Sequence, residues 1–168
     1  GDKAYFGPEP EFFTFDDVRF KNEMNESSFM IDSTEGPYNT GKKFENGNMG
    51  HRPGVKGGYF PVPPVDSAQD MRAEMLKALK DMGVKVEKHH HEVAPGQHEL
   101  GMYFGKLTDM ADNVQLYKYA VQMVSHSFGK TSTFMPKPVK GDNGSGMHVH
   151  QSIWKGNTPM FMGDKYAG

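Results

Sequence analysis

The sequence predicts an α+β fold in which an antiparallel sheet carries helices on one face. Two observations predict it. Strand-like stretches occur in neighbouring pairs joined by turn residues, and two stretches with helical spacing lie between them. No repeat, coiled coil or low-complexity tract is present. The 168 residues are enough for one domain with a hydrophobic core.

The first strand is expected over residues 3–20, KAYFGPEPEFFTFDDVRF, because this stretch is rich in aromatic side chains. Pro8 and Pro10 lack a backbone N–H, so the strand is expected to lie at a sheet edge or to be irregular. Residues 27–33, SSFMIDS, predict a second, short strand.

Residues 35–58 are rich in glycine and show no apolar periodicity, which predicts a long loop. Loops of this length in compact domains are usually functional or mobile. Within it, residues 36–53 are expected to be exposed, with few buried side chains, because glycines and scattered charges cannot build a core.

Two helices are expected from apolar residues at helical spacing. The first is capped by Asp66 or Ser67 and stopped by Gly83, and the second begins at Thr108 and ends at Gly129. The residues expected to face inward are Met71, Met75, Leu79 and Met82 in the first helix, and Val114, Leu116, Ala120, Val121, Val124 and Phe128 in the second.

The remaining strands surround these helices. Residues 84–93 and 97–107 flank the turn sequence APG and predict a β-hairpin. Residues 131–137 and 146–154 supply further strands. The chain ends shortly after a strand-like run, and we expect it to be a piece of a longer protein.

Composition excludes several classes of protein. The net charge is only −2, so neither nucleic acid nor a membrane surface is an expected partner. No apolar run approaches the roughly 20 residues of a membrane span, and the first residues lack the features of a secretory signal. The absence of cysteine excludes disulfides, thiolate zinc sites and cysteine nucleophiles. A cytoplasmic enzyme fits these observations.

Glu9 and Glu11 alternate along the first strand and therefore share a face. Residues two apart on a strand are separated by roughly 6.6 Å, whereas opposite oxygens around one Mg²⁺ are only about 4 Å apart. The pair thus suits two neighbouring ions better than one, and by the same argument at most one of His148 and His150 need be a ligand. The alternative is that both acids form the solvated face of an edge strand.

Glu92 and Glu99 stand on either side of the APG turn and would lie close together in a hairpin. The preceding triplet His89, His90 and His91 cannot all point at one ion, and a polar strand end is the alternative interpretation. Several glutamates with a histidine and no cysteine are the donors that Mg²⁺ or Mn²⁺ prefers. Gathered carboxylates repel one another unless a cation neutralises them.

Four stretches together resemble the catalytic domain of glutamine synthetase, bacterial type I: GPEPEFFTFDDVRF, VKGGYFPVPPVDSAQD, HHHEVAPGQHE, and TFMPKP followed by GDNGSGMHVHQS. The resemblance covers residues 1–168 in family order. It implies that the antiparallel sheet is part of a half-barrel. It also implies a reaction in which ATP phosphorylates the side chain of L-glutamate and ammonia then displaces phosphate to give glutamine.

The resemblance implies roles for individual residues. Two ions, Mg²⁺ or Mn²⁺, are expected, with one histidine of the HVH pair on a metal and the other facing ATP. The implied metal ligands are Glu11, Glu92 and Glu99 for the ion near the glutamate and ammonium pocket, and Glu9 and His148 for the ion at the ATP phosphates. The implied ATP contacts are Glu87, Phe104, His150 and Ser152, where Phe104 is either a structural residue or a contact of the adenine. The implied glutamate contacts are Asn143 and Gly144.

The resemblance also implies what lies elsewhere in the family. The small N-terminal β-grasp domain, the C-terminal half of the catalytic domain, and the arginines that contact the transferred phosphate are not among residues 1–168. The family forms homo-oligomers, here expected to be a dodecamer of two stacked hexamers. The segment between Glu92 and Glu99 is one residue shorter than in some members. Three alternatives remain: a ligase that joins glutamate to another amine, a non-catalytic relative with a structural role, and a metal-dependent hydrolase on an unrelated fold.

Overall fold

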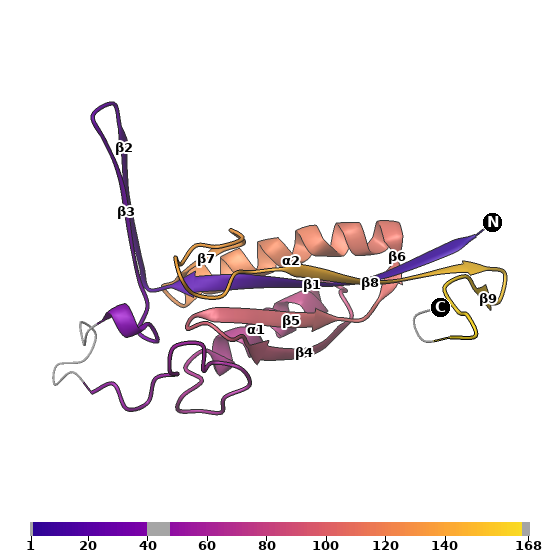
Figure 1. Cartoon of the computed structure of the whole chain (residues 1–168), viewed down its shortest axis with the longest axis horizontal. Coiled ribbons are helices and arrows are strands. Elements are labelled where there is room, and N and C mark those ends of the chain that lie inside the picture. Colours follow the sequence, from indigo (N-terminus) through magenta and orange to yellow (C-terminus); the bar gives the residue numbers. More distant parts are fainter. Residues whose placement is uncertain (1, 40–47, 166–168) are drawn as a thin grey trace.

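The computed structural model describes residues 2–39 and 48–165. Within them the main unit is a seven-stranded antiparallel sheet (Figure 1). Its strands are β1 (Lys3–Phe15), β4 (Val86–His91), β5 (Gln97–Met102), β6 (Gly105–Lys106), β7 (Thr131–Thr133), β8 (Met147–Lys155) and β9 (Thr158–Pro159). The order is β4-β5-β1-β8-β9, with β6 and β7 also paired to β1. The predicted α+β class with an antiparallel sheet is confirmed.

Strand β1 lies in the middle of the sheet, so the expected edge position is wrong. The reason is local. On one side β1 pairs continuously with β8, but on the other it pairs with β6 at Tyr5 and Phe6 and with β5 only from Glu11 onward. Pro8 and Pro10 fall in the interval between these pairings, where a missing N–H costs no ladder bond to β5 or β6.

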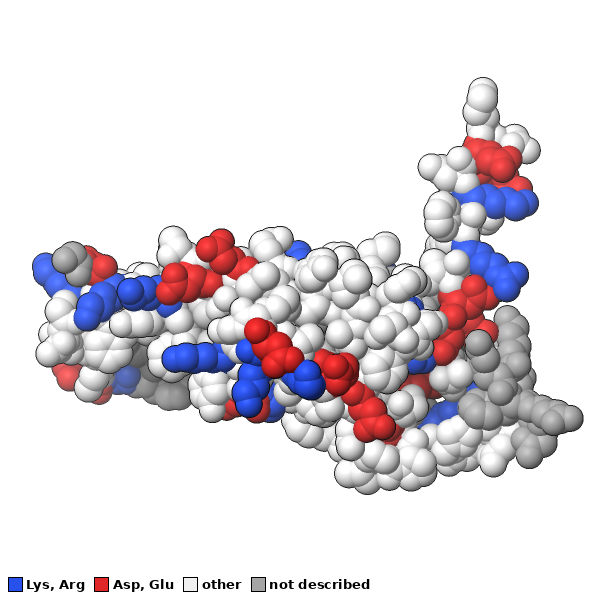
Figure 2. Space-filling model, turned by 180° about the vertical axis from the view of Figure 1, so that it is seen from behind, with Lys and Arg blue, Asp and Glu red and all other residues white. Residues whose placement is uncertain are grey.

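The first strand also ends earlier than predicted. The chain turns at Asp16, and β2 (Asp17–Glu23) and β3 (Glu26–Asp32) form a separate hairpin. This hairpin projects from the body of the molecule, as seen from both sides (Figures 1 and 2). Phe20 and Phe29, paired across it, are both largely exposed.

The two α-helices are α1 (Gln69–Asp81) and α2 (Leu107–Ser127). Neither predicted N-cap is correct, whereas Gly83 and Gly129 directly follow the C-caps Met82 and Phe128 with positive φ, so both helices end where predicted. Ala68 is the N-cap of α1, because Asp66 and Ser67 are committed to other buried partners. Lys106 is the N-cap of α2, which places Thr108 inside the first turn. No helix among the described residues has the length and apolar character needed to cross a bilayer.

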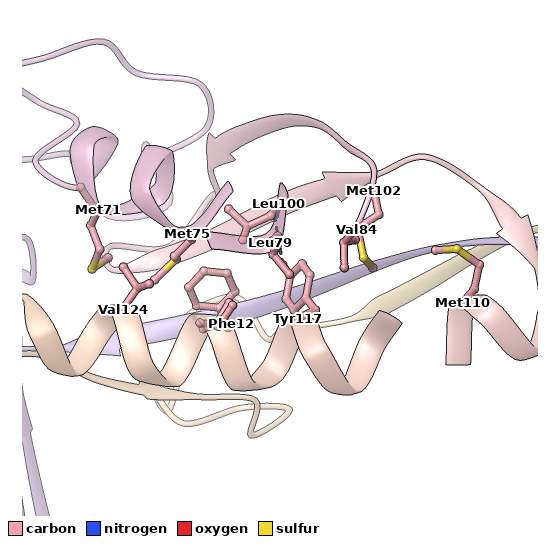
Figure 3. Packing of buried hydrophobic residues seen from close by; sticks show 13 residues of the cluster. Phe12, Met71, Met75, Leu79, Val84, Leu100, Met102, Met110, Tyr117 and Val124 are labelled. Atoms are coloured by element: carbon pink, nitrogen blue, oxygen red, sulfur yellow. Dashed lines mark hydrogen bonds between the residues drawn. The ribbon is translucent and has the colours of Figure 1, made fainter. Parts of the chain in front are cut away.

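Both helices pack on one face of the sheet and share a core with it. Figure 3 shows Phe12, Leu79 and Tyr117 gathered between the helices and the strands. Tyr117 was not predicted, yet it is fully buried, and its hydroxyl donates to the Pro10 carbonyl at 2.6 Å. Two residues predicted to face inward, Met82 and Phe128, are exposed because they are the C-cap residues. The predicted core positions that are buried are Met71, Met75, Leu79, Ala120, Val121 and Val124.

The glycine-rich loop is less exposed than predicted where it begins. Residues Pro37–Asn39 form a short 3₁₀ helix, and the fully buried Asn39 donates to Asp32 Oδ1 at 2.9 Å. Its own side-chain oxygen accepts from Arg52 at 2.7 Å. Residues 40–47 lie outside the described residues, and 48–50 are exposed. Polar side chains at its two ends thus anchor this loop.

Candidate functional site

The face of the sheet opposite the helices carries the predicted acids. Glu9 pairs with His148 across β1 and β8, and Glu11 pairs with Glu99 across β1 and β5. Paired residues on neighbouring strands point to the same face. Their sequence neighbour Phe12 enters the hydrophobic core, so strand alternation directs these four side chains away from it.

His90, Glu92 and Glu99 form a buried cluster whose potential ligand atoms all lie within 4.8 Å of one another. His90 Nδ1 is 3.6 Å from Glu92 Oε1, and its Nε2 is 3.6 Å from Glu99 Oε1. Carboxylate oxygens with one imidazole form a donor set that Mg²⁺ or Mn²⁺ can use. The structure therefore brings Glu92 and Glu99 together. The sequence did not single out His90 within its triplet, although its two-residue spacing from Glu92 was a usable signal.

Burial and neighbouring charges shift the pKa values of this cluster. Burial raises the pKa of Glu92, and the negative charges of Glu11 and Glu99 raise it further, against the opposing effects of the Val93 N–H and His90. For His90, burial lowers the pKa, but the contacts with Glu99 and Glu92 outweigh it and the net shift is upward. A divalent cation would relieve this carboxylate repulsion.

Glu11 is held in place by two donors on the same oxygen. Its Oε2 accepts from Gln97 Nε2 at 2.9 Å and from the Gly146 N–H at 3.2 Å. A Cβ placed on Gly146 would lie 3.4 Å from His148 Nε2 and 3.6 Å from Glu11 Oε1. Gly146 therefore lies against two of the predicted ligands, His148 and Glu11, and a side chain at this position would contact both.

Glu9 makes its side-chain contact with His150, whose Nε2 lies 3.3 Å from Glu9 Oε2. His150 in turn lines a pocket of about 210 Å³ together with Tyr5, Phe104, Gln151 and Ser152. Three predicted ATP contacts, Phe104, His150 and Ser152, are therefore brought together. Glu87 is exposed on β4 and is not among the residues that line this pocket.

Tyr5 is a pocket residue that the sequence did not reveal. Its ring meets Phe104 edge-on, with centroids 5.9 Å apart and an interplanar angle of 89°. Only the pairing of β1 with β6 and β8 brings Tyr5 beside residues about 100 and 147 positions later.

The loop of residues 141–146 is fixed against the preceding segment. The Ser145 N–H donates to the Pro136 carbonyl at 2.8 Å, and a Cβ on Gly144 would lie only 2.6 Å from that same oxygen. Glycine is therefore required at position 144. The Asn143 N–H is satisfied by Asp142 Oδ1 at 2.9 Å. The two predicted glutamate contacts thus stand on a tightly held loop.

A buried network of charged and polar side chains connects β4 and β5 to α1 and to the loop that precedes α1. His91 Nε2 lies 2.7 Å from Glu35 Oε2, and His91 Nδ1 lies 2.6 Å from the Glu92 carbonyl. Burial lowers the pKa of His91, but the Glu35 carboxylate and the Glu92 carbonyl outweigh it and raise that pKa, which favours an imidazolium that donates from both ring nitrogens. Arg72 is also buried and is paired with Asp66 and His98. Sequence patterns missed this network because its members come from a loop, a helix and two strands.

Phe60 covers the cluster from the side. Its ring stacks on His90 with centroids 4.5 Å apart and an interplanar angle of 14°. The backbone of Phe60 has φ of 53°, a left-handed conformation that is uncommon for a bulky residue. The segment between the glycine-rich loop and α1 thus contributes an aromatic wall to the site.

Comparison with known proteins agrees with this geometry. The family described as glutamine synthetase, catalytic domain, matches residues 1–168. Glutamine synthetase of Azospirillum brasilense is 67% identical over 166 residues, which are 99% of this chain and 36% of that protein. Glutamine synthetase of Bradyrhizobium diazoefficiens is 65% identical over 167 residues, with the same two shares. The cryo-EM structure of Plasmodium falciparum glutamine synthetase superposes with a TM-score of 0.86 at 30% identity, over 97% of this chain and 32% of that one.

The chain thus spans 36% of the length of these two bacterial relatives. The family match extends over every residue, and the resemblance carried by the four sequence motifs is confirmed. The chain belongs to the glutamine synthetase family, and its residues match the catalytic domain of that family.

Proposed function

We propose that the protein containing this chain catalyses the ATP-dependent ligation of ammonia to L-glutamate, giving L-glutamine, ADP and phosphate. In the proposed reaction the glutamate side-chain carboxylate attacks the γ-phosphorus of ATP, the bond from this phosphorus to the bridging oxygen breaks, ADP leaves and γ-glutamyl phosphate forms. Ammonia then attacks the activated carbonyl carbon, the bond from this carbon to the phosphate oxygen breaks, phosphate leaves, and the nitrogen loses a proton to give the amide. The names of the 67% and 65% identical relatives support the same reaction here.

The observation that carries the proposal is the continuity between the acid cluster and the pocket. Glu99, a member of the cluster with His90 and Glu92, is paired with Glu11 across β5 and β1. Glu11 in turn lies two residues from Glu9 on β1. Glu9 contacts His150, which lines the pocket. A phosphate donor in the pocket would therefore point its charged end toward the acids.

The proposal includes two divalent cations, as the family resemblance implies. Buried carboxylates whose mutual repulsion raises the pKa of Glu92 are the environment that a hard cation stabilises. Such ions, Mg²⁺ or Mn²⁺, neutralise charge on phosphoryl oxygens when bound. The residues proposed to hold them are Glu11, Glu92 and Glu99 for one ion, and Glu9 and His148 for the other.

The chain's own side chains would bind and orient the substrates. Phe104 offers an exposed aromatic face for the adenine, while His150 and Ser152 offer polar atoms to the nucleotide. Asn143 and Gly144 would contact glutamate. Because phosphoryl transfer depends chiefly on positioning and charge neutralisation, these contacts supply what the reaction needs from this part of the protein. Glu87 is retained in the proposal as a nucleotide contact from the neighbouring strand β4.

The proposal extends to a cytoplasmic homo-oligomer, a dodecamer by analogy with the family. The projecting β2–β3 hairpin supports an assembly, because Phe20 and Phe29 on it are 77% and 72% exposed. Size measurement by light scattering tests this part separately.

The activity is tested on the protein expressed from its complete reading frame. It is incubated with ATP, glutamate, Mg²⁺ or Mn²⁺, and either ammonium, methylamine or no amine, and glutamine and phosphate are measured. Glutamine formation that depends on ammonium supports the proposal. Preference for methylamine would identify a ligase for another amine, and no turnover with any amine would favour a structural relative.

A further inference from the structure

Gln97, the first residue of β5, is 1% exposed and uses its side chain to join three segments of the site. Its Nε2 donates to Glu11 Oε2 at 2.9 Å and to the Gly144 carbonyl at 3.0 Å. Its Oε1 accepts from the Ala94 N–H at 3.2 Å. Three of the four hydrogen bonds available to an amide are therefore used.

The orientation of this amide follows from its partners. A carboxylate and a carbonyl can only accept, and a backbone N–H can only donate, so Nε2 must face Glu11 and Gly144. No other type of side chain of this length offers two donors and an acceptor in the same plane. A buried group with all its partners fixed also has little freedom to move.

The bridge constrains which oxygen of Glu11 is available. Gln97 and the Gly146 N–H both donate to Oε2, and among residues 2–39 and 48–165 no hydrogen bond to Oε1 is present. The Glu11 N–H also donates to the Gly146 carbonyl at 3.0 Å. Glu11 and the loop of residues 141–146 are thus held to each other on both sides, and Gln97 ties the pair to the turn between Glu92 and Glu99.

We propose that Gln97 is a positioning residue that couples the metal carboxylate Glu11 to the loop that contacts glutamate. This inference rests on the proposed function of the site. It assigns to Gln97 a joint effect on metal affinity and on glutamate binding. It assigns no effect on the nucleotide pocket, because the hydrogen-bond partners of the Gln97 side chain, Glu11, Gly144 and Ala94, do not line that pocket.

The test uses the complete protein and the substitutions Gln97→Met, which keeps the side-chain length, and Gln97→Glu, which keeps its shape. Gln122→Met, at an exposed position of α2, is the matched control. Mn²⁺ binding is measured directly by calorimetry and by electron paramagnetic resonance without substrates, and KM is measured for glutamate and for ATP. Outer-shell partners of metal ligands typically contribute about 10–100-fold to affinity. We expect Mn²⁺ affinity to fall and KM for glutamate to rise by that order, with KM for ATP within about twofold.

A double-mutant cycle separates positioning from general stability. If Gln97 acts through Glu11, the losses of Mn²⁺ affinity caused by Gln97→Met and Glu11→Gln will not add, whereas independent effects would add. Should Gln97→Glu fail to fold, Gln97→Met carries the comparison, and circular dichroism identifies the folded variants. An active wild type with unchanged Mn²⁺ affinity and glutamate KM in folded Gln97→Met would overturn this inference alone. A wild type that neither binds Mn²⁺ nor makes glutamine would overturn the proposed function and this inference with it.

Discussion

Asp16 and Lys130 form an ion pair in which Lys130 Nζ lies 2.7 Å from Asp16 Oδ1, although 114 residues separate them in the chain. Asp16 Oδ2 also accepts from the Thr34 N–H at 2.7 Å. The pair therefore anchors the point where β1 gives way to the projecting hairpin. Both side chains are mostly shielded from water, so the interaction is less screened than a surface pair.

Replacing Lys130 by Met should lower the free energy of unfolding by roughly 1.5 kcal/mol at pH 7, the scale of a hydrogen bond to a charged group. The effect should depend on pH. Burial raises the pKa of Asp16, but Lys130 and Thr34 outweigh it and lower the pKa below 3.8. A lowered carboxyl pKa gives stability that is present above 3.8 and lost as pH falls through the folded-state pKa. Urea denaturation at pH 7 and pH 3 should show the difference shrinking in acid, with Lys85→Met as the exposed control.

Glu35→Gln should destabilise the protein by roughly 3 kcal/mol, because it leaves the buried His91 imidazolium without its counter-charge. Glu35 also accepts from Ser67 Oγ and from the Gly96 N–H, both at 2.7 Å, so the loss reaches the turn between β4 and β5. Denaturation of this variant is compared with that of Glu23→Gln, an exposed glutamate on β2. Equal stability of the two variants would show that His91 is neutral in the native state.

Glu92→Gln should have opposite effects with and without metal. Without metal it removes one of the mutually repelling carboxylates, so stability should be unchanged or higher. With Mn²⁺ the wild type should gain stability by mass action, and the variant should gain much less because its affinity falls at least about 10-fold. Melting temperatures across a Mn²⁺ titration measure both effects, with Glu74→Gln on α1 as control. A wild type that Mn²⁺ does not stabilise would contradict the metal assignment.

The sequence predicted those features that depend on local spacing. Strand alternation placed Glu9 and Glu11 on one face, and the APG turn brought Glu92 close to Glu99. Helical spacing found Met75 and Leu79 in the core. In each case neighbours in the chain set the direction of the side chain, so pattern alone was sufficient.

Features that depend on pairing between residues far apart in the chain could not be predicted from sequence patterns. The central position of β1 follows from its register with β8, and it overrides the tendency of Pro8 and Pro10 to lie at edges. Likewise nothing in the local sequence distinguishes Gln97 from other strand residues. Its role depends on hydrogen bonds to β1 and to the loop of residues 141–146, which are distant in the chain. The predicted N-cap of α1 failed for a related reason, because the Asp66 carboxylate pairs with the buried Arg72.

Phe104→Ala is expected to separate nucleotide binding from stability. The ring of Phe104 is 69% exposed and touches the edge of Tyr5, so its removal should change the free energy of unfolding by less than about 0.5 kcal/mol, as for most surface substitutions. Stacking of a base on an aromatic ring contributes about 1–3 kcal/mol, so KM for ATP should rise by about 10-fold or more. KM for glutamate and Mn²⁺ affinity should be nearly unchanged, because Phe104 lines the pocket and is not a member of the acid cluster. Steady-state kinetics on the complete protein provide the measurement, and Tyr119→Ala, which removes an exposed aromatic ring on α2, provides the control. A Phe104→Ala variant with wild-type KM for ATP would show that the adenine lies elsewhere, and the pocket lined by Tyr5, His150 and Ser152 would then need a different ligand.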